Sequence, residues 1–99
     1  MVAELIIVSW RDIPAQVIVK AGRRSAKRPL PERFQEAIDR AAMRAGVRGD
    51  DAYLAEWRRQ ASPCGDDLEA EADAAAARLE ADYPPERVQA LVEQGGAER

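Results

Sequence analysis

The segment Ala3–Arg28, with the sequence AELIIVSWRDIPAQVIVKAGRRSAKR, decides the predicted fold. Its residues 5–8 (LIIV) are apolar at consecutive positions and mostly β-branched, which favours a strand that is covered on both faces. We predict this strand over Ala3–Trp10 and a second strand over Gln16–Lys20, joined as in a hairpin, with Pro14 marking the break between them. The first strand is expected to be central, or to lie at an edge that a second subunit covers.

After this segment the sequence predicts mainly helices rich in alanine and glutamate. Gly22 ends the second strand, and residues 23–29 are expected to form a basic loop. Apolar residues recur at helical spacing over residues 34–45, 68–79 and 88–92, which predicts three amphipathic helices.

Residues 52–60 (AYLAEWRRQ) fit two different structures. Their composition favours a short helix, in which Tyr53 and Trp57 stack one turn apart. A third strand, with Tyr53, Ala55 and Trp57 on one face, is the alternative. Residues 62–65 (SPCG) predict a turn, and an aspartate after this turn is expected to cap the long helix that follows.

The chain is predicted to be a single α+β domain over residues 1–94, with residues 95–99 as a frayed tail. A small sheet of two or three strands is expected to be covered by an Ala-rich helical layer. Much of the 46% apolar content is alanine, so the core is modest for a chain of 99 residues. Self-association into a homodimer is therefore left open.

Charge is divided unevenly along the chain. Residues 1–60 contain 12 Lys and Arg against 8 Asp and Glu, whereas residues 61–99 contain 3 against 10. Either the two halves attract each other within the fold, or they form two surfaces that meet different partners. The sequence has one cysteine, no long apolar run and no signal-peptide pattern, so a cytoplasmic protein that does not contact membranes is expected.

Composition excludes several kinds of catalytic site. Without histidine there is no Ser-His-Asp triad, no Cys-His pair and no imidazole ligand for a metal. The single cysteine, Cys64, cannot form a four-thiolate zinc site or a CxxC pair within one chain. The doubled aspartates at 50–51 and 66–67 are what helix capping predicts. We therefore predict no catalytic residue, no metal site and no cofactor, and the sequence leans against an enzyme without deciding the question.

Two groups of residues are candidates for a binding surface. Trp10, Arg11 and Asp12 lie in the predicted hairpin connection, where Trp10 could close an edge of the core, with Arg11 and Asp12 pairing across the connection. Alternatively, Trp10 and Arg11 form an exposed contact pair, since both residue types are frequent at interface hot spots. The second group is basic and consists of Lys20, Arg23, Arg24, Lys27 and Arg28.

The basic group has three candidate targets. One is the protein's own acidic helix after residue 66, which would neutralise the group within the fold. Another is an acidic protein partner or a small anion bearing phosphate or carboxylate groups. Nucleic acid is the third and the least favoured, because the chain is acidic overall, at −3, and the basic segment contains no aromatic residue for base stacking.

The phrases WRDIPAQVIVK, ERFQEAIDRAAMRAG and YLAEWRR give this chain a family resemblance. Over about residues 3–83 it resembles the small bacterial domain family called "virulence factor", in the stand-alone form of the domain that conserved virulence factor C joins to HEAT-like repeats. The resemblance supplies no catalytic residue. Stand-alone members are encoded near folate- and corrinoid-dependent one-carbon enzymes. The resemblance therefore implies an accessory role in methyl transfer, where the folate and corrinoid ligands are acidic and would suit an anion-binding surface.

We expect a non-catalytic accessory module that docks onto a larger cytoplasmic protein through the hairpin and its basic flank. The alternatives are a small ligand-binding or enzyme subunit that uses Arg11 and Asp12 on an anionic substrate, and a nucleic-acid-binding protein that uses the basic segment 20–28.

Overall fold

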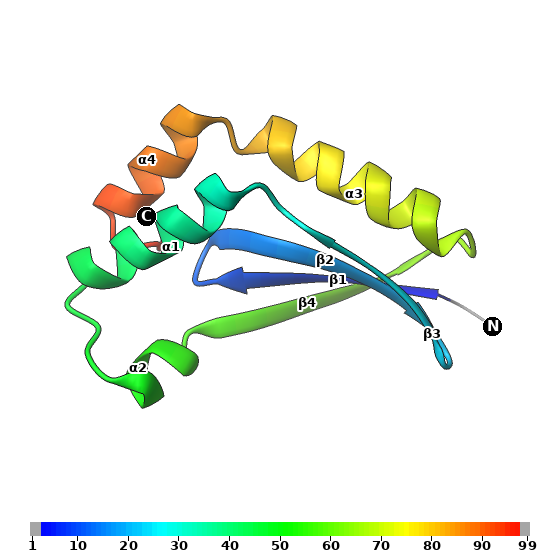
Figure 1. The fold of residues 1–99 in the computed structure, drawn as a ribbon, viewed down its shortest axis with the longest axis horizontal. Coiled ribbons are helices and arrows are strands. Elements are labelled where there is room, and N and C mark those ends of the chain that lie inside the picture. Colours follow the sequence, from blue (N-terminus) through cyan, green and yellow to red (C-terminus); the bar gives the residue numbers. More distant parts are fainter. Residues whose placement is uncertain (1–2, 98–99) are drawn as a thin grey trace.

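The computed structural model describes residues 3–97 as a four-stranded antiparallel sheet packed against helices (Figure 1). The strands are β1 (Ala3–Trp10), β2 (Ile13–Ala21), β3 (Arg24–Pro29) and β4 (Trp57–Cys64), in the order β3-β2-β1-β4. The helices are α1 (Glu32–Arg44), α2 (Asp50–Leu54), α3 (Leu68–Asp82) and α4 (Pro85–Glu93). The predicted α+β class is confirmed, and β1 is central as expected, but the described residues contain four strands instead of two or three.

Two segments that were not predicted as strands complete the sheet. The expected basic loop 23–29 is mostly β3, which pairs with β2 from Gln16↔Pro29 to Ala21↔Arg24. Over residues 52–60, α2 ends at Leu54 and β4 begins at Trp57, so both structures weighed for this segment are partly right. The turn predicted at residues 62–65 is wrong for residues 62–64, which belong to β4 and pair with β1 as far as Ala3↔Cys64.

Pro14 lies inside β2 instead of separating two strands. The β1–β2 register shifts between Val8 and Ser9, since Val8 pairs with Gln16 and Ser9 pairs with Pro14. This shift leaves Ala15 as an extra residue on β2, which is the arrangement of a β-bulge. The irregular ladder accommodates a proline, which has no N–H to donate.

The two faces of the sheet have different surroundings. Leu5, Val17 and Val19 pack against α3 through its buried residues Leu68, Ala72 and Ala75. We call this side the helix face. On the opposite side, Ile6, Val8 and Ile18 form a small cluster with Trp57, and most of their neighbours on the same side, such as Lys20, Lys27 and Arg59, are exposed. We call this second side the open face.

The amphipathic helices are confirmed with small changes. In α1, all the predicted inward residues except Ala45 are buried, and in α4 the buried residues are Val88, Leu91 and Val92. Asp67 caps α3 by accepting a hydrogen bond from the Ala70 N–H at 3.1 Å. The frayed tail expected from residue 95 is wrong for Gly95 and Gly96, which are buried; residues 98–99 lie outside the described part of the chain.

Candidate functional site

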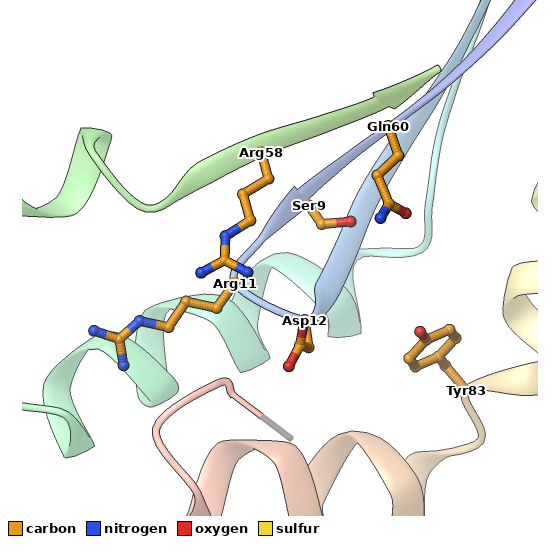
Figure 2. A pocket seen from close by; sticks show the side chains of 6 residues that line it. All are labelled: Ser9, Arg11, Asp12, Arg58, Gln60 and Tyr83. Atoms are coloured by element: carbon orange, nitrogen blue, oxygen red, sulfur yellow. The ribbon is translucent and has the colours of Figure 1, made fainter. Parts of the chain in front are cut away.

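A small polar cavity lies beside the β1–β2 turn (Figure 2). Its volume is about 130 Å³, and it is lined by Ser9, Arg11, Asp12, Arg58, Gln60 and Tyr83. Ser9 and Gln60 come from the helix face of neighbouring strands, and Tyr83 follows α3. Figure 2 shows the Tyr83 ring across the cavity from Ser9 and Arg58. The structure therefore brings two predicted site residues, Arg11 and Asp12, to one concave place.

The Arg11 guanidinium is already occupied by the protein itself. Its Nη1 donates to the Gly95 carbonyl at 2.9 Å, its Nη2 lies 3.3 Å from Glu56 Oε1, and its Cζ lies 5.0 Å from the Trp10 ring centroid. Arg11 also has φ +52°, an uncommon backbone conformation for a residue other than glycine. Arg11 thus joins the hairpin turn to the C-terminal segment and to the start of β4. Arg58 is the more exposed cation of the cavity, with its side chain 59% exposed and its Nη2 3.8 Å from Glu56 Oε2.

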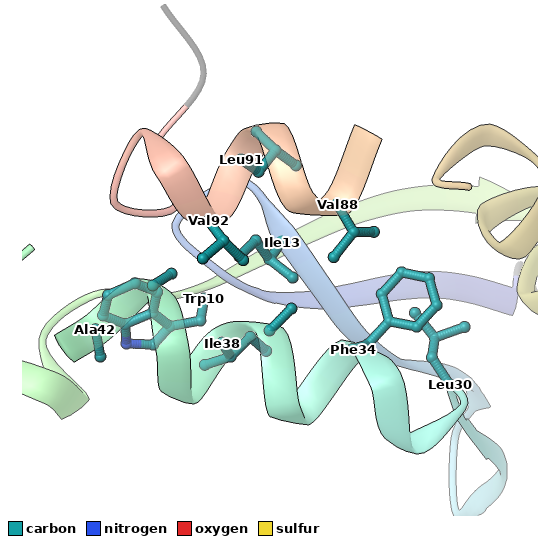
Figure 3. Close-up of a cluster of buried hydrophobic side chains, with 11 residues drawn as sticks. Trp10, Ile13, Leu30, Phe34, Ile38, Ala42, Val88, Leu91 and Val92 are labelled. Carbon is teal, nitrogen blue, oxygen red and sulfur yellow. The ribbon is translucent and has the colours of Figure 1, made fainter. Parts of the chain in front are cut away.

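Trp10 belongs to the core and not to a contact surface (Figure 3). Its side chain is 0% exposed and packs among residues of α1 and α4, such as Ile38 and Val92. The indole Nε1 donates to the Tyr53 carbonyl at 2.9 Å, and the two rings stack with centroids 5.7 Å apart. The expectation that Trp10 is an exposed contact residue is wrong, because a Trp leaving β1 closes the edge of this core instead.

The predicted basic group lies far from the hairpin turn. Lys20, Arg23, Arg24, Lys27 and Arg28 lie at or beside the β2–β3 turn, whereas Arg11 and Asp12 lie at the other end of β2. Lys20, the nearest residue of the β2–β3 turn, is eight residues from Asp12, or roughly 26 Å, whereas Arg28 pairs with Val17 and is about 16 Å away at about 3.3 Å per residue. The turn residues Lys20, Arg23 and Arg24 therefore lie at the opposite end of β2 from Arg11 and Asp12.

Only part of the basic group is neutralised within the fold. Arg28 hydrogen-bonds to Glu69 and lies 2.6 Å from Asp73 on α3, and these hydrogen bonds, Glu69 first, raise the pKa of the Arg28 guanidinium. Within residues 3–97, Lys20, Lys27 and their two arginine neighbours at positions 23 and 24 are exposed and have no ion pair. The attraction between the two halves is therefore confirmed for Arg28, and a surface that meets another partner stays a prediction for the four exposed cations.

Three of the basic residues surround the open face. The register places Lys20, Lys27 and Arg59 on the same side as Ile6, Val8 and Ile18. These three apolar residues form the floor of the face and are 4–8% exposed, whereas the basic residues around them are exposed. Glu4 is the single carboxylate that the register adds to this side within the described strands. The open face is thus an apolar floor with a basic rim.

Sequence reasoning missed Arg59, Arg58 and Tyr83. Arg58 and Arg59 were assigned mainly to a helix, which hid the fact that adjacent strand residues point to opposite faces. The alternation Arg58, Gln60, Ser62 against Arg59, Ala61, Pro63 could have indicated one polar face and one mixed face. Tyr83 could not be found, because only the tertiary fold brings the end of α3 to the β1–β2 turn.

The remaining chemistry of the described residues is sparse. Cys64 is half-buried at the end of β4, and burial first, then the charges of Glu71 and Asp66, raises the pKa of its thiol. Such a thiol is a weak nucleophile at neutral pH. Among residues 3–97, no three His, Cys, Asp or Glu side chains are grouped as metal ligands. None of the helices in this range is long and apolar enough to span a membrane.

The comparisons with known proteins identify a family. The family model described as "Virulence factor" matches residues 8–92, so the chain belongs to the virulence factor family and the resemblance seen in the sequence is confirmed. No curated protein and no solved structure matches this chain.

Proposed function

We propose that this domain is a non-catalytic docking module whose open face binds an acidic amphipathic helix of a larger protein in the bacterial cytoplasm. The observation that supports this proposal is the apolar floor of Ile6, Val8 and Ile18, with unpaired Lys27 and Arg59 on opposite sides of it. A helix with an apolar stripe flanked by carboxylates matches such a surface in both shape and charge. A place beside folate- and corrinoid-dependent methyl transfer is a prediction that rests on the family resemblance alone.

The size of the face suits one helix of moderate length. β1 has 8 residues and is therefore about 26 Å long, which equals the length of a helix of about 18 residues. The long side chains of Lys20, Lys27 and Arg59 can cover the floor with their aliphatic stems when the face is empty. They can move aside and keep their charges at the rim when a helix binds. The face is therefore soluble alone and also able to bind.

A model peptide tests the proposal directly. The probe is a fluorescently labelled helical peptide of about 18 residues with leucine along one face and glutamate on the rest. We expect fluorescence anisotropy to show binding that weakens as salt is raised, since the rim contacts are exposed ion pairs. Reversing two rim charges with Lys27→Glu and Arg59→Glu should weaken binding about tenfold or more, equivalent to about 1.4 kcal/mol.

A matched control keeps the net charge change constant. Arg48→Glu and Arg78→Glu alter two exposed arginines that lie away from the open face, so binding should stay within about twofold of the unmodified protein. Equal losses in the two double variants would show that only net charge matters and would contradict the proposal. Tighter binding to a single-stranded oligonucleotide than to the peptide, lost in the rim variant alone, would assign the face to nucleic acid instead.

The polar cavity supports a second candidate function. Arg58, Ser9 and Tyr83 could together hold a carboxylate or phosphate group beside Asp12. This would make the domain a small-anion binding subunit, with Arg58 replacing Arg11 in the predicted role. Isothermal titration with inorganic phosphate and with succinate tests it. Binding that Arg58→Ala abolishes and Arg59→Ala leaves unchanged would support a site on the helix face, and no heat with either ligand would remove it.

A further inference from the structure

β4 is the least covered strand of the sheet. It is an edge strand, and six of its eight residues, those between Trp57 and Cys64, are exposed. The buried residues of α3 pack against Leu5, Val17, Val19 and Ala26, which belong to the other three strands. Figure 1 shows β4 at the border of the fold, with no element along its outer side. β4 therefore lacks cover on its edge and on most of both faces.

The hydrogen-bond pattern shows which backbone groups of β4 point outward. The Arg11 N–H donates to the Glu56 carbonyl at 3.0 Å, and the register continues through Ser9↔Arg58 and Ile7↔Gln60. Hydrogen-bonded pairs alternate along an antiparallel ladder, so even-numbered residues of β4 bond to β1 and odd-numbered residues point to solvent. The outward residues are Trp57, Arg59, Ala61 and Pro63. A proline at an outward position agrees with this pattern, because no ladder bond needs its N–H.

The opposite edge of the sheet is more strongly protected against pairing than β4, whose eight residues contain two arginines and Pro63. β3 has 6 residues, of which three are basic and one is Pro29. Basic side chains and proline on a short edge strand discourage addition of another strand. β4 is longer, and its register with β1 is continuous from Ala3↔Cys64 to Trp10↔Trp57 without a bulge. Its two arginines are adjacent, so each face of the strand carries only one of them.

We infer that β4 pairs antiparallel with β4 of a second copy of this chain, with the two-fold axis at Gln60, to form an eight-stranded sheet. This register places Arg59 opposite Ala61 of the second copy and Arg58 opposite its Ser62, so each long side chain faces a small one. It also places Trp57 opposite Pro63 of the second copy. The outward N–H and C=O groups then form about six backbone hydrogen bonds across the interface.

Pairing at β4 would join the two open faces into one surface. Arg59 lies on the open face and is one residue from the axis, so both copies would supply an arginine to the centre of the joined face. The docking surface proposed above would double in width, and its basic rim would become continuous. The inference concerns the edge and not the floor of that face, so it stands or fails separately from helix binding.

Cysteine cross-linking tests the register of the pair. In a Cys64→Ser background, Gln60→Cys places two thiols opposite each other at a pair without hydrogen bonds, where Cα atoms are about 4.5 Å apart and a disulfide can form. The matched control Ser62→Cys places the cysteine on the same strand and the same face. Its cysteine and that of the second copy would be four residues apart along the strand, or roughly 13 Å. We expect rapid covalent dimer formation by the first variant under mild oxidation and little by the second.

Light scattering after size exclusion tests the pairing itself. The mass should rise from 10.9 kDa towards twice that value between about 1 µM and about 1 mM protein. Ala61→Pro removes an outward N–H at the centre of the interface and should keep the protein monomeric, with an unchanged circular dichroism spectrum. A protein that stays monomeric throughout, or equal cross-linking of the two cysteine variants, would overturn the inference. If Ala61→Pro unfolds, the cross-linking comparison still decides.

Discussion

Replacing Trp10 with phenylalanine measures how much the hairpin depends on one indole ring. Trp10 is 0% exposed, and its Nε1 donates to the Tyr53 carbonyl at 2.9 Å. Phenylalanine removes this hydrogen bond, worth about 1 kcal/mol net, and leaves a partly buried carbonyl without its donor. It also removes about two buried ring carbons, at about 0.8 kcal/mol each. We expect the free energy of unfolding to fall by about 2–4 kcal/mol.

Urea denaturation followed by far-ultraviolet circular dichroism is the assay, because it does not depend on tryptophan fluorescence. Trp57→Phe is the matched control, since Trp57 is half-buried at the start of β4 and no hydrogen bond of its indole is seen among residues 3–97. This control should cost less than about 1 kcal/mol. Equal losses for the two variants would refute the assignment of Trp10 to the core.

Two further predictions concern a thiol and a glycine. The raised pKa of the Cys64 thiol means that less thiolate is present at a given pH. Iodoacetamide should therefore modify the folded protein more slowly than the urea-unfolded protein at pH 8, and Glu71→Gln should restore part of the rate. Equal modification rates in the folded and unfolded protein would contradict this prediction. Gly96 has φ +92°, and an added Cβ would lie 2.9 Å from Trp10 Cζ3, whereas at Gly49, with φ +84°, an added Cβ meets nothing within 4 Å. Urea unfolding should therefore show that Gly96→Ala costs about 1–3 kcal/mol more than Gly49→Ala, and equal costs would mean that the Trp10 ring can move aside.

The elements predicted correctly from sequence are those whose apolar residues follow one clear period. β1 has a continuous apolar run, and α1 and α4 have stripes at helical spacing, so burial and local propensity favour the same structure. β3 and β4 have no such run, because β3 is mostly basic and β4 is mostly polar. They form strands because β2 and β1 each have an edge to pair. Their strand structure is decided by these neighbours, which a local sequence pattern does not include.

The candidate site was only partly predictable for the same reason. The sequence indicated that Lys20 and Lys27 would be exposed cations, and they are. It could not indicate that Arg28 is ion-paired with α3, since its partners Glu69 and Asp73 are 41 and 45 residues away along the chain. Nor could it indicate that Arg59 shares a face with Lys27, because the β1–β4 pairing was not predicted. Residue type predicted the charge, and topology decided which charges face solvent together.

The position of the helical layer explains why the open face and β4 are left uncovered. α1 and α4 use their apolar residues to enclose Trp10 and Ile13 at the end of the hairpin, and α3 uses its own to cover the helix face. Among the described residues no apolar helix is left for the floor of the open face. The aliphatic stems of the long basic side chains cover that floor in the free domain. When a helix displaces these stems, the charged groups stay hydrated at the rim, so little solvation free energy is lost. Since Ile6, Val8 and Ile18 are already only 4–8% exposed, a partner on this face would gain most of its contact from the basic rim and from the aliphatic stems of the rim side chains.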